Sequence, residues 1–293
     1  MAREPRSLVG KVVAVTGGAR GIGEATARAL VAKGARVAIG DLDRELAERT
    51  AADIGSDTLA LELDVTRRDS FAGFLDQVEE RLGSLDVLVN NAGIMPLGRF
   101  TEEDDVTAQR MVDINVHGVL YGMKLALPRM ERRGTGHVIN LASQAGKAGF
   151  PGGATYCGTK HFVVGLSEAV RWEVRGTGVE VSCVMPVVVE TELAAGLPQT
   201  RAVKHVTPED VAEEIVGALK VPRFDVFVPR SVGPLTQAIG VLPRGGREFM
   251  ARALKADRVL ADADPSARAG YELRAARSEP GLEPGDEQRQ LTG

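Results

Sequence analysis

The strongest constraint on the fold is the alternation of short apolar runs with longer segments of helical periodicity. Short, continuously apolar and β-branched runs are typical of buried parallel strands. When such strands alternate with helices of roughly 10 to 20 residues, they form a parallel sheet covered on both faces by right-handed crossovers. Seven strands are expected, at residues 11–16, 35–40, 58–63, 85–89, 137–141, 180–185 and 225–228.

The segments between these runs predict the helices, and the pattern predicts a single doubly wound α/β domain at residues 8–230. One expected helix ends near residue 33, and the others cover about residues 44–54, 68–82, 106–133, 155–175 and 208–219. Beyond the domain, residues 231–276 are expected to form a helical extension, with a short amphipathic helix at 247–259. Residues 277–293 are polar and rich in Pro, Gly and charge, so we expect a disordered tail.

Composition excludes several classes of function. The net charge of −4 provides no basic field for nucleic acid. The two cysteines suggest neither a disulfide framework nor a metal site. No apolar run approaches the roughly 20 residues that span a bilayer, and the first nine residues are too short and polar for a signal peptide. The sequence therefore predicts a cytoplasmic protein.

A glycine-rich turn follows the first predicted strand. Gly17, Gly21 and Gly23 allow backbone amides to approach a pyrophosphate at the start of the next helix. Asp41 ends the second strand, where a carboxylate can accept hydrogen bonds from the adenosine ribose and repel a 2′-phosphate. Arg20 could bind that phosphate, or could be a solvated charge near a helix start. We therefore expect NAD as the cofactor, in preference to NADP.

Tyr156 and Lys160 lie four residues apart, at the start of a predicted helix, and project from one helix face. A cation beside a phenol favours the phenolate and lowers the pKa of the phenol. A shift of about three pH units requires about 4 kcal/mol of differential stabilisation. The spacing alone is common, and a tyrosine at this position could equally be an amphipathic core residue.

Several motifs in order resemble the short-chain dehydrogenase/reductase family across roughly residues 8–230. They are Thr16-Gly17-Gly18-Ala19-Arg20-Gly21-Ile22-Gly23, Asn90-Asn91-Ala92-Gly93, Asn115, Ser143 and Tyr156-x-x-x-Lys160. The resemblance implies a Rossmann-type domain, a nicotinamide cofactor and reversible alcohol–carbonyl hydride transfer. It also implies a homodimer or homotetramer that associates through the helices bearing Asn115 and Tyr156.

The family resemblance assigns roles to four catalytic candidates. Tyr156 would be the acid-base that exchanges a proton with the substrate oxygen. Lys160 would lower the pKa of Tyr156 and hold the nicotinamide ribose. Ser143 would donate a hydrogen bond to the same oxygen, and Asn115 would support a water molecule that links Lys160 to solvent. Taken singly, Ser143 could be a turn residue and Asn115 a self-satisfied polar group.

The resemblance also implies cofactor contacts along the strand ends. They are Gly17, Arg20, Gly21, Ile22 and Gly23 in the turn, Asp41 at the ribose, Asp64 and Val65 at the adenine, Asn91, Ala92 and Gly93 along the cofactor, Tyr156 and Lys160, and Pro186, Val189 and Thr191 near the carboxamide. Val187 stands where the family usually has glycine. A β-branched residue adds bulk there and does not readily adopt a positive φ.

The expected pocket walls indicate the substrate class. Residues 95–97, 144–150 and 187–197 are mostly apolar, so we expect a lipophilic alcohol or ketone, such as a sterol, a retinoid-like compound or a fatty compound. The alternative function is a catalytically silent dinucleotide sensor or scaffold on the same fold. That alternative would predict loss of Ser143, Tyr156 or Lys160, and all three are present.

The extension beyond residue 230 allows two interpretations. The favoured one is a helical arm that covers the pocket or another subunit. The other is a peripheral membrane contact, because apolar residues alternate with arginines as in a basic amphipathic helix.

Overall fold

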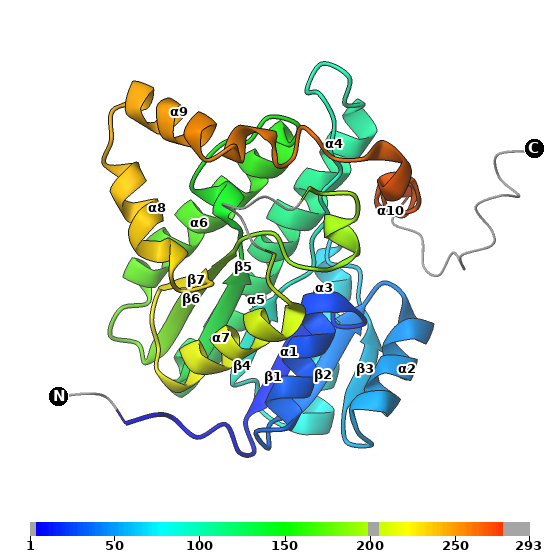
Figure 1. Cartoon of the computed structure of the whole chain (residues 1–293). Coiled ribbons are helices and arrows are strands. Elements are labelled where there is room, and N and C mark those ends of the chain that lie inside the picture. Colours follow the sequence, from blue (N-terminus) through cyan, green and yellow to red (C-terminus); the bar gives the residue numbers. More distant parts are fainter. Residues whose placement is uncertain (1–3, 199–204, 278–293) are drawn as a thin grey trace, which may run out of the picture.

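The computed structural model describes residues 4–198 and 205–277. Seven parallel strands form one sheet in the order β3-β2-β1-β4-β5-β6-β7, so the predicted doubly wound, Rossmann-type fold is confirmed (Figure 1). The strand order reverses between β1 and β4, which is where such sheets bind ligands. The strands are β1 (Val12–Thr16), β2 (Arg36–Asp41), β3 (Leu59–Glu62), β4 (Val87–Asn90), β5 (Gly136–Leu141), β6 (Val179–Pro186) and β7 (Asp225–Val228).

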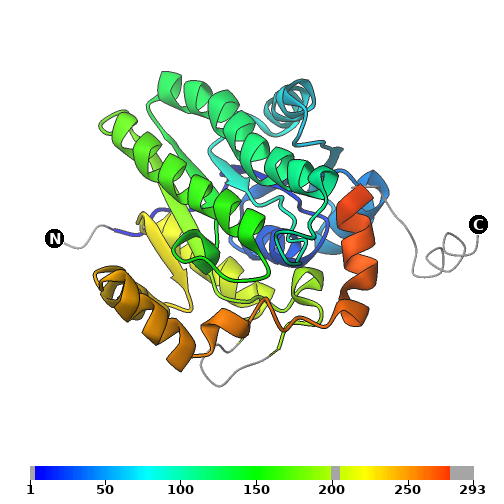
Figure 2. The same cartoon turned by 90° about the horizontal axis from the view of Figure 1, so that it is seen from above.

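Helices cover both faces of the sheet. One layer contains α1, α2 and α7, and the opposite layer contains α3, α5 and α6 (Figures 1 and 2). Their bounds are α1 (Gly21–Val31), α2 (Arg44–Ile54), α3 (Arg68–Leu82), α5 (Gly118–Arg133), α6 (Ala154–Glu173) and α7 (Pro208–Lys220).

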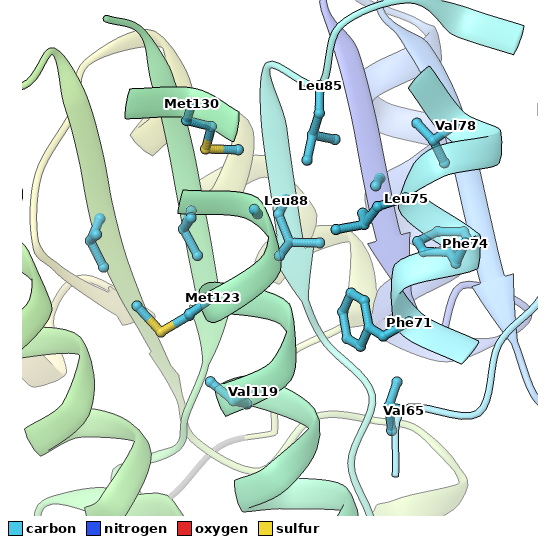
Figure 3. Close-up of a cluster of buried hydrophobic side chains, with 14 of the residues drawn as sticks. Val65, Phe71, Phe74, Leu75, Val78, Leu85, Leu88, Val119, Met123 and Met130 are labelled. Carbon is cyan, nitrogen blue, oxygen red and sulfur yellow. The ribbon is translucent and has the colours of Figure 1, made fainter. Parts of the chain in front are cut away.

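The central strands are buried on both faces, which explains their continuous apolar sequences. In β1, Val12 and Ala14 face one core, whereas Val13 and Val15 face the other. The first core is filled by large side chains from α3, β4 and α5, including Phe71, Phe74, Leu88, Met123 and Met130 (Figure 3). Burial of one such side chain stabilises the fold by about 1.5–3 kcal/mol.

The prediction of a single helix at residues 106–133 is wrong in one respect. The structure divides it into α4 (Asp105–Val112), a π-helical turn (Asp113–His117) and α5. A π-turn forms i→i+5 hydrogen bonds and so accommodates one extra residue without ending the helix. Hydrophobic periodicity cannot detect this insertion, because the apolar pattern continues on both sides of it.

The C-terminal extension consists of α8 (Val232–Gly240), α9 (Arg244–Ala253), a short 3₁₀ turn (Ala256–Arg258) and α10 (Pro265–Arg277). The helix expected at 247–259 instead begins at Arg244 and ends at Ala253, where Lys255 adopts a positive φ of 54°. The extension crosses the sheet edge formed by the strand C-termini, with α8 beside β7 and α10 beside α4 (Figures 1 and 2). The tail predicted at 277–293 lies outside the described residues, except for Arg277.

Candidate active site

Two connected cavities open at the C-terminal edge of the sheet. The tyrosine cavity, of about 540 Å³, is lined by Ser143 and Tyr156 among others. The glycine-turn cavity, of about 620 Å³, is lined by Gly17 and Asp41 among others. The two cavities share five lining residues and are therefore continuous: Ile22, Asn91, Gly93, Thr191 and Leu193.

Tyr156 and Ser143 meet at the wall of the tyrosine cavity. Tyr156 lies in the first turn of α6, and Ser143 lies two residues after the end of β5. Burial raises the pKa of Tyr156 to about 12, and a side-chain hydrogen bond with Ser143 partly opposes this rise. The phenol is therefore protonated at neutral pH in this structure.

Lys160 lies one helical turn beyond Tyr156 and is also buried. Its Nζ atom is 5.7 Å from the centroid of the Tyr156 ring and donates a 2.9 Å hydrogen bond to the carbonyl oxygen of Leu141. Burial lowers the pKa of Lys160 to about 8. The predicted lowering of the Tyr156 pKa is not seen here, because desolvation of the phenol outweighs the Ser143 hydrogen bond that favours the phenolate.

Asn115 lies in the π-turn and is only 1 % exposed. Its Oδ1 accepts a 2.9 Å hydrogen bond from the Ile94 amide, and its Nδ2 donates to the Ile94 carbonyl oxygen and to Thr159 Oγ1. The side chain thus fixes the segment after β4 that borders both cavities. These bonds satisfy the amide side chain, and the water-supporting role of Asn115 stays a prediction.

The glycine turn has a backbone geometry that requires glycine. Gly17 and Gly21 have positive φ values of 62° and 55°, which favour glycine. A Cβ atom at position 21 would lie 3.2 Å from Cγ2 of Thr191, so a side chain would narrow the space between the turn and the β6 loop. At Gly23, a Cβ would lie 2.0 Å from the carbonyl oxygen of Gly17. The turn therefore exposes backbone amides at the start of α1.

Asp41 and Arg20 both line the glycine-turn cavity. The Asp41 carboxylate accepts hydrogen bonds from the amides of Ala19 (3.0 Å) and Asp43 (3.2 Å), and burial raises its pKa. The Arg20 guanidinium binds Asp43 at 3.1 Å and Glu192 at 3.4 Å. Arg20 is thus paired with two carboxylates, a role that neither of the interpretations from the sequence, a 2′-phosphate ligand or a solvated charge, includes.

The remaining predicted contacts at β3 and β4 also lie at this cavity. Asp64, Val65, Ala92 and Gly93 line it together with Asn91. The Asn91 amide group donates 2.9 Å hydrogen bonds to the carbonyl oxygens of Thr16 and Gly17. Asn91 therefore braces the glycine turn from the neighbouring strand.

The segment after β6 borders both cavities. Pro186, Val187 and Val189 line the tyrosine cavity, and Thr191 lines both cavities. Val187 donates a 2.9 Å hydrogen bond from its amide to the Val228 carbonyl oxygen, and its φ is not positive. The backbone at position 187 therefore does not require glycine, and the extra bulk of Val187 narrows the tyrosine cavity.

The walls of the tyrosine cavity are mainly apolar, as the sequence predicts for residues 95–97, 144–150 and 187–197. Met95, Ala145, Phe150 and Leu197 belong to these segments and line it. The extension contributes further lining residues: Ser231, Val232, Leu235, Thr236, Ile239, Leu254, Ala256, Val259 and Leu260. The favoured interpretation of the extension, an arm over the pocket, agrees with this placement.

Sequence analysis did not predict that α10 borders a cavity. Tyr271, Arg274 and Ala275 on this helix line the glycine-turn cavity. Asp264 and Pro265 could have revealed its start, because Asp264 caps the helix by accepting a hydrogen bond from the Ser266 amide and Pro is favoured in a first turn. Within residues 4–198 and 205–277, no cluster of His, Cys, Asp or Glu could hold a metal ion, and no helix could span a membrane.

A sequence model of the short chain dehydrogenase family matches residues 11–202. The chain is 38% identical to a sorbitol dehydrogenase of Cereibacter sphaeroides, over 72% of this chain and 83% of that protein. It is 34% identical to a 3-alpha-(or 20-beta)-hydroxysteroid dehydrogenase of Mycobacterium bovis, over 71% and 82% of the respective lengths. The crystal structure of 3-ketoacyl-(acyl-carrier-protein) reductase from Brucella melitensis complexed with NADH has a TM-score of 0.70 and 28% identity, and the match covers 76% of this chain and 98% of that one. The chain belongs to the short-chain dehydrogenase/reductase family.

Proposed function

We propose that the protein is an NAD-dependent oxidoreductase that interconverts a lipophilic alcohol and its ketone or aldehyde. The observation that carries this proposal is the convergence of the Ser143 and Tyr156 hydroxyl groups on an apolar cavity that is continuous with the glycine-turn cavity. Relatives named as dehydrogenases of a polyol and of hydroxysteroids support the reaction class.

In this proposal Tyr156 donates its phenolic proton to the substrate oxygen during carbonyl reduction and accepts a proton during alcohol oxidation. Ser143 donates a hydrogen bond to the same oxygen and stabilises the charge that develops on it. Lys160 provides a buried cation beside the phenol. A bound nicotinamide dinucleotide would supply or accept the hydride.

The residues around the glycine-turn cavity fit such a cofactor. The amides of the glycine turn would bind the diphosphate, Asp41 would bind the adenosine ribose, and Asp64 with Val65 would hold the adenine. We assign Pro186, Val189 and Thr191 as contacts of the cofactor near its carboxamide. We propose NAD over NADP because the Asp41 carboxylate would repel a 2′-phosphate and Arg20 is engaged by Asp43, whose carboxylate is largely buried.

The proposed substrate class follows from the tyrosine cavity. A volume of about 540 Å³ lies within the range of sites for drug-sized ligands. Its walls are mostly hydrocarbon, and Gln144, a polar lining residue, is engaged by the Met185 carbonyl oxygen (3.0 Å) and by Thr236 Oγ1 (3.0 Å). A lipophilic alcohol or ketone therefore suits the cavity better than a sugar or an acyl thioester.

We also propose that residues 8–230 form the catalytic domain and that the protein is a homo-oligomer. Helix α6 carries two large apolar side chains that are solvent-exposed in the monomer, Phe162 and Trp172. Exposed aromatic residues of this kind are enriched at protein interfaces. A membrane contact through α9, which exposes Phe249 among arginines, remains the less favoured prediction for the extension.

The proposal is tested with purified full-length protein, NAD or NADP, and a panel of alcohols, by following the absorbance of the reduced cofactor. We expect NAD-dependent oxidation that is faster for apolar secondary alcohols than for small charged hydroxy acids. Binding of NAD without turnover of any alcohol or carbonyl in the panel would favour the silent dinucleotide sensor instead. Failure to bind either cofactor would refute both functions.

A further inference from the structure

We propose that Arg274 of α10 is a ligand for the diphosphate of the dinucleotide, and that Glu192 holds Arg274 in place until the diphosphate displaces it. The inference rests on the proposed dinucleotide cofactor. It assigns a cofactor-binding residue to the C-terminal extension, outside the glycine turn and the strand ends.

Helix α10 is held firmly against the two loops that border the cavities. Arg268 on this helix is only 2 % exposed. Its guanidinium donates hydrogen bonds to the carbonyl oxygens of Met95 (2.7 Å), Leu193 (2.8 Å) and Ala195 (3.0 Å). The Tyr271 hydroxyl also accepts a 2.7 Å hydrogen bond from the Met95 amide. This network fixes the position from which Arg274 reaches the cavity.

Arg274 lies at the wall of the glycine-turn cavity beside a second arginine. Its Nη2 atom is 3.2 Å from Glu192 Oε2, and Nη1 of Arg20 is 3.4 Å from the same oxygen. One carboxylate oxygen therefore bridges two guanidinium groups, one from the glycine turn and one from α10. All three residues line the cavity.

The position of this bridge indicates the ligand. Glu192 directly follows Thr191, whose side chain faces Gly21 across the cavity. Gly21 is the first residue of α1, and a helix start with exposed amides attracts the phosphates of a nucleotide. Guanidinium groups bind phosphate oxygens in a bidentate manner. The two arginines therefore flank the expected diphosphate position.

Glu192 is suited to being displaced. Its side chain is 54 % exposed, so it can turn into solvent, whereas the Arg274 side chain is 25 % exposed and belongs to the fixed helix. An ion pair with so exposed a carboxylate is weak in water. A diphosphate carries more negative charge than one carboxylate and can replace Glu192 as a partner of Arg274.

This arrangement predicts effects of opposite sign for the two partners of one ion pair. Removal of Arg274 should weaken binding of a diphosphate, and removal of the competing Glu192 charge should strengthen it. If the pair only ties α10 to the β6 loop, loss of either partner should weaken binding in the same direction.

The test is isothermal titration of the full chain with ADP-ribose, which carries the diphosphate but no nicotinamide, and with adenosine. We expect Arg274→Ala to weaken ADP-ribose binding about tenfold and to leave adenosine binding unchanged, since the variant loses a charge-assisted hydrogen bond to the diphosphate and the wild type gives up the bond to Glu192. We expect Glu192→Gln to strengthen ADP-ribose binding. Arg252→Ala removes an exposed arginine on α9, outside both cavities, and should change neither affinity.

Arg274→Lys serves as a second variant that keeps the charge without the bidentate geometry, and we expect it to weaken ADP-ribose binding less than Arg274→Ala does. Thermal unfolding of each variant checks that α10 remains folded. Equal ADP-ribose affinity of the wild type and Arg274→Ala, or weakening by both Arg274→Ala and Glu192→Gln, overturns the inference and leaves the proposed function intact. Failure of the wild type to bind ADP-ribose and NAD would overturn the proposed function itself.

Discussion

The Arg268 guanidinium donates a 2.7 Å hydrogen bond to the carbonyl oxygen of Met95, which lies 173 positions earlier in the chain. Through this contact the last described helix is attached to the loop after β4. Arg268 also forms a 2.7 Å ion pair with Glu272 within the same helix. A charge this deeply buried must keep all of its partners to be tolerated.

We expect Arg268→Ala to lower the free energy of unfolding by about 3 kcal/mol, because it leaves backbone carbonyl groups unpaired and opens a cavity. Urea denaturation measures the change. Arg244→Ala, at an arginine that is almost fully exposed on α9, is the matched control and should change stability by less than about 0.5 kcal/mol. Similar small effects for both variants would show that α10 contributes little to the fold.

The role of Tyr156 predicts a selective loss of turnover. We expect Tyr156→Phe to reduce kcat by about 10²–10⁴-fold, the range that general acid–base catalysis contributes, while NAD affinity changes little. Stopped-flow and steady-state assays with the best alcohol of the panel would measure kcat, and titration would measure NAD binding. Undiminished turnover in this variant would refute Tyr156 as the acid-base.

The raised pKa of Tyr156 predicts the pH dependence of the two directions. Alcohol oxidation needs the phenolate, whose fraction rises tenfold per pH unit below a pKa of about 12. The rate of oxidation should therefore increase with pH throughout the range in which the fold is stable. Carbonyl reduction needs the phenol and should not accelerate with pH. Oxidation that slows between pH 6 and 8 would contradict this assignment.

Replacing the Asp41 carboxylate should change the preference of the protein between NAD and NADP. We expect Asp41→Asn to raise the ratio of NADP to NAD affinity by about tenfold, because the variant removes both the repulsion of a 2′-phosphate and a charged acceptor for the ribose hydroxyls. Titration with both cofactors measures the ratio. Asp57→Asn, at an exposed position outside the cavity, provides the control. An unchanged ratio would mean that Asp41 does not face the ribose.

The buried imidazole of His137 should make the fold less stable in acid. It is buried in β5, with Nε2 2.8 Å from Ser182 Oγ, and burial lowers its pKa from the ordinary value near 6.5 to about 3. Between these values the unfolded chain binds a proton that the folded chain does not. Stability is therefore lost as the pH falls from about 6.5 to 3, by about 1.4 kcal/mol per unit.

Urea unfolding at several pH values between 4 and 7 measures this slope. We expect His137→Gln to flatten it, since the variant has no titrating group at that position. His161→Gln, at an exposed histidine on α6, should retain the wild-type slope. A wild-type slope that persists in His137→Gln would assign the acid sensitivity to other groups.

The sheet and the core of the site could be predicted from sequence because both depend on local patterns. A strand that is buried on both faces must be apolar throughout, so the seven strands were recognisable, and a turn that needs positive φ at Gly17 and Gly21 must contain glycine. Tyr156 and Ser143 then follow from their positions beside these elements.

The remaining features depend on contacts between distant segments. No local pattern shows that Arg268 is buried against the carbonyl groups of Leu193 and Ala195, because an arginine on a short polar helix is usually exposed. The pKa of Tyr156 was predicted in the wrong direction for this structure, since sequence spacing reveals the nearby cation but not the extent of desolvation. Likewise, only the hydrogen bond from the Val187 amide to the Val228 carbonyl oxygen showed how the backbone at position 187 is held without glycine.

The π-turn at Asp113–His117 lets α4 and α5 share one rotational frame, although the segment holds one residue more than α geometry would. Each residue of an α-helix turns the following side chains by about 100°. If the same residues formed ordinary α-helix, the extra residue would rotate α4 by that angle relative to α5. Arg110, which lines the glycine-turn cavity, would then leave the wall, and buried Met111 would turn away from the core beside Tyr156. The π geometry of this segment, as much as its composition, is thus required by the site that it borders.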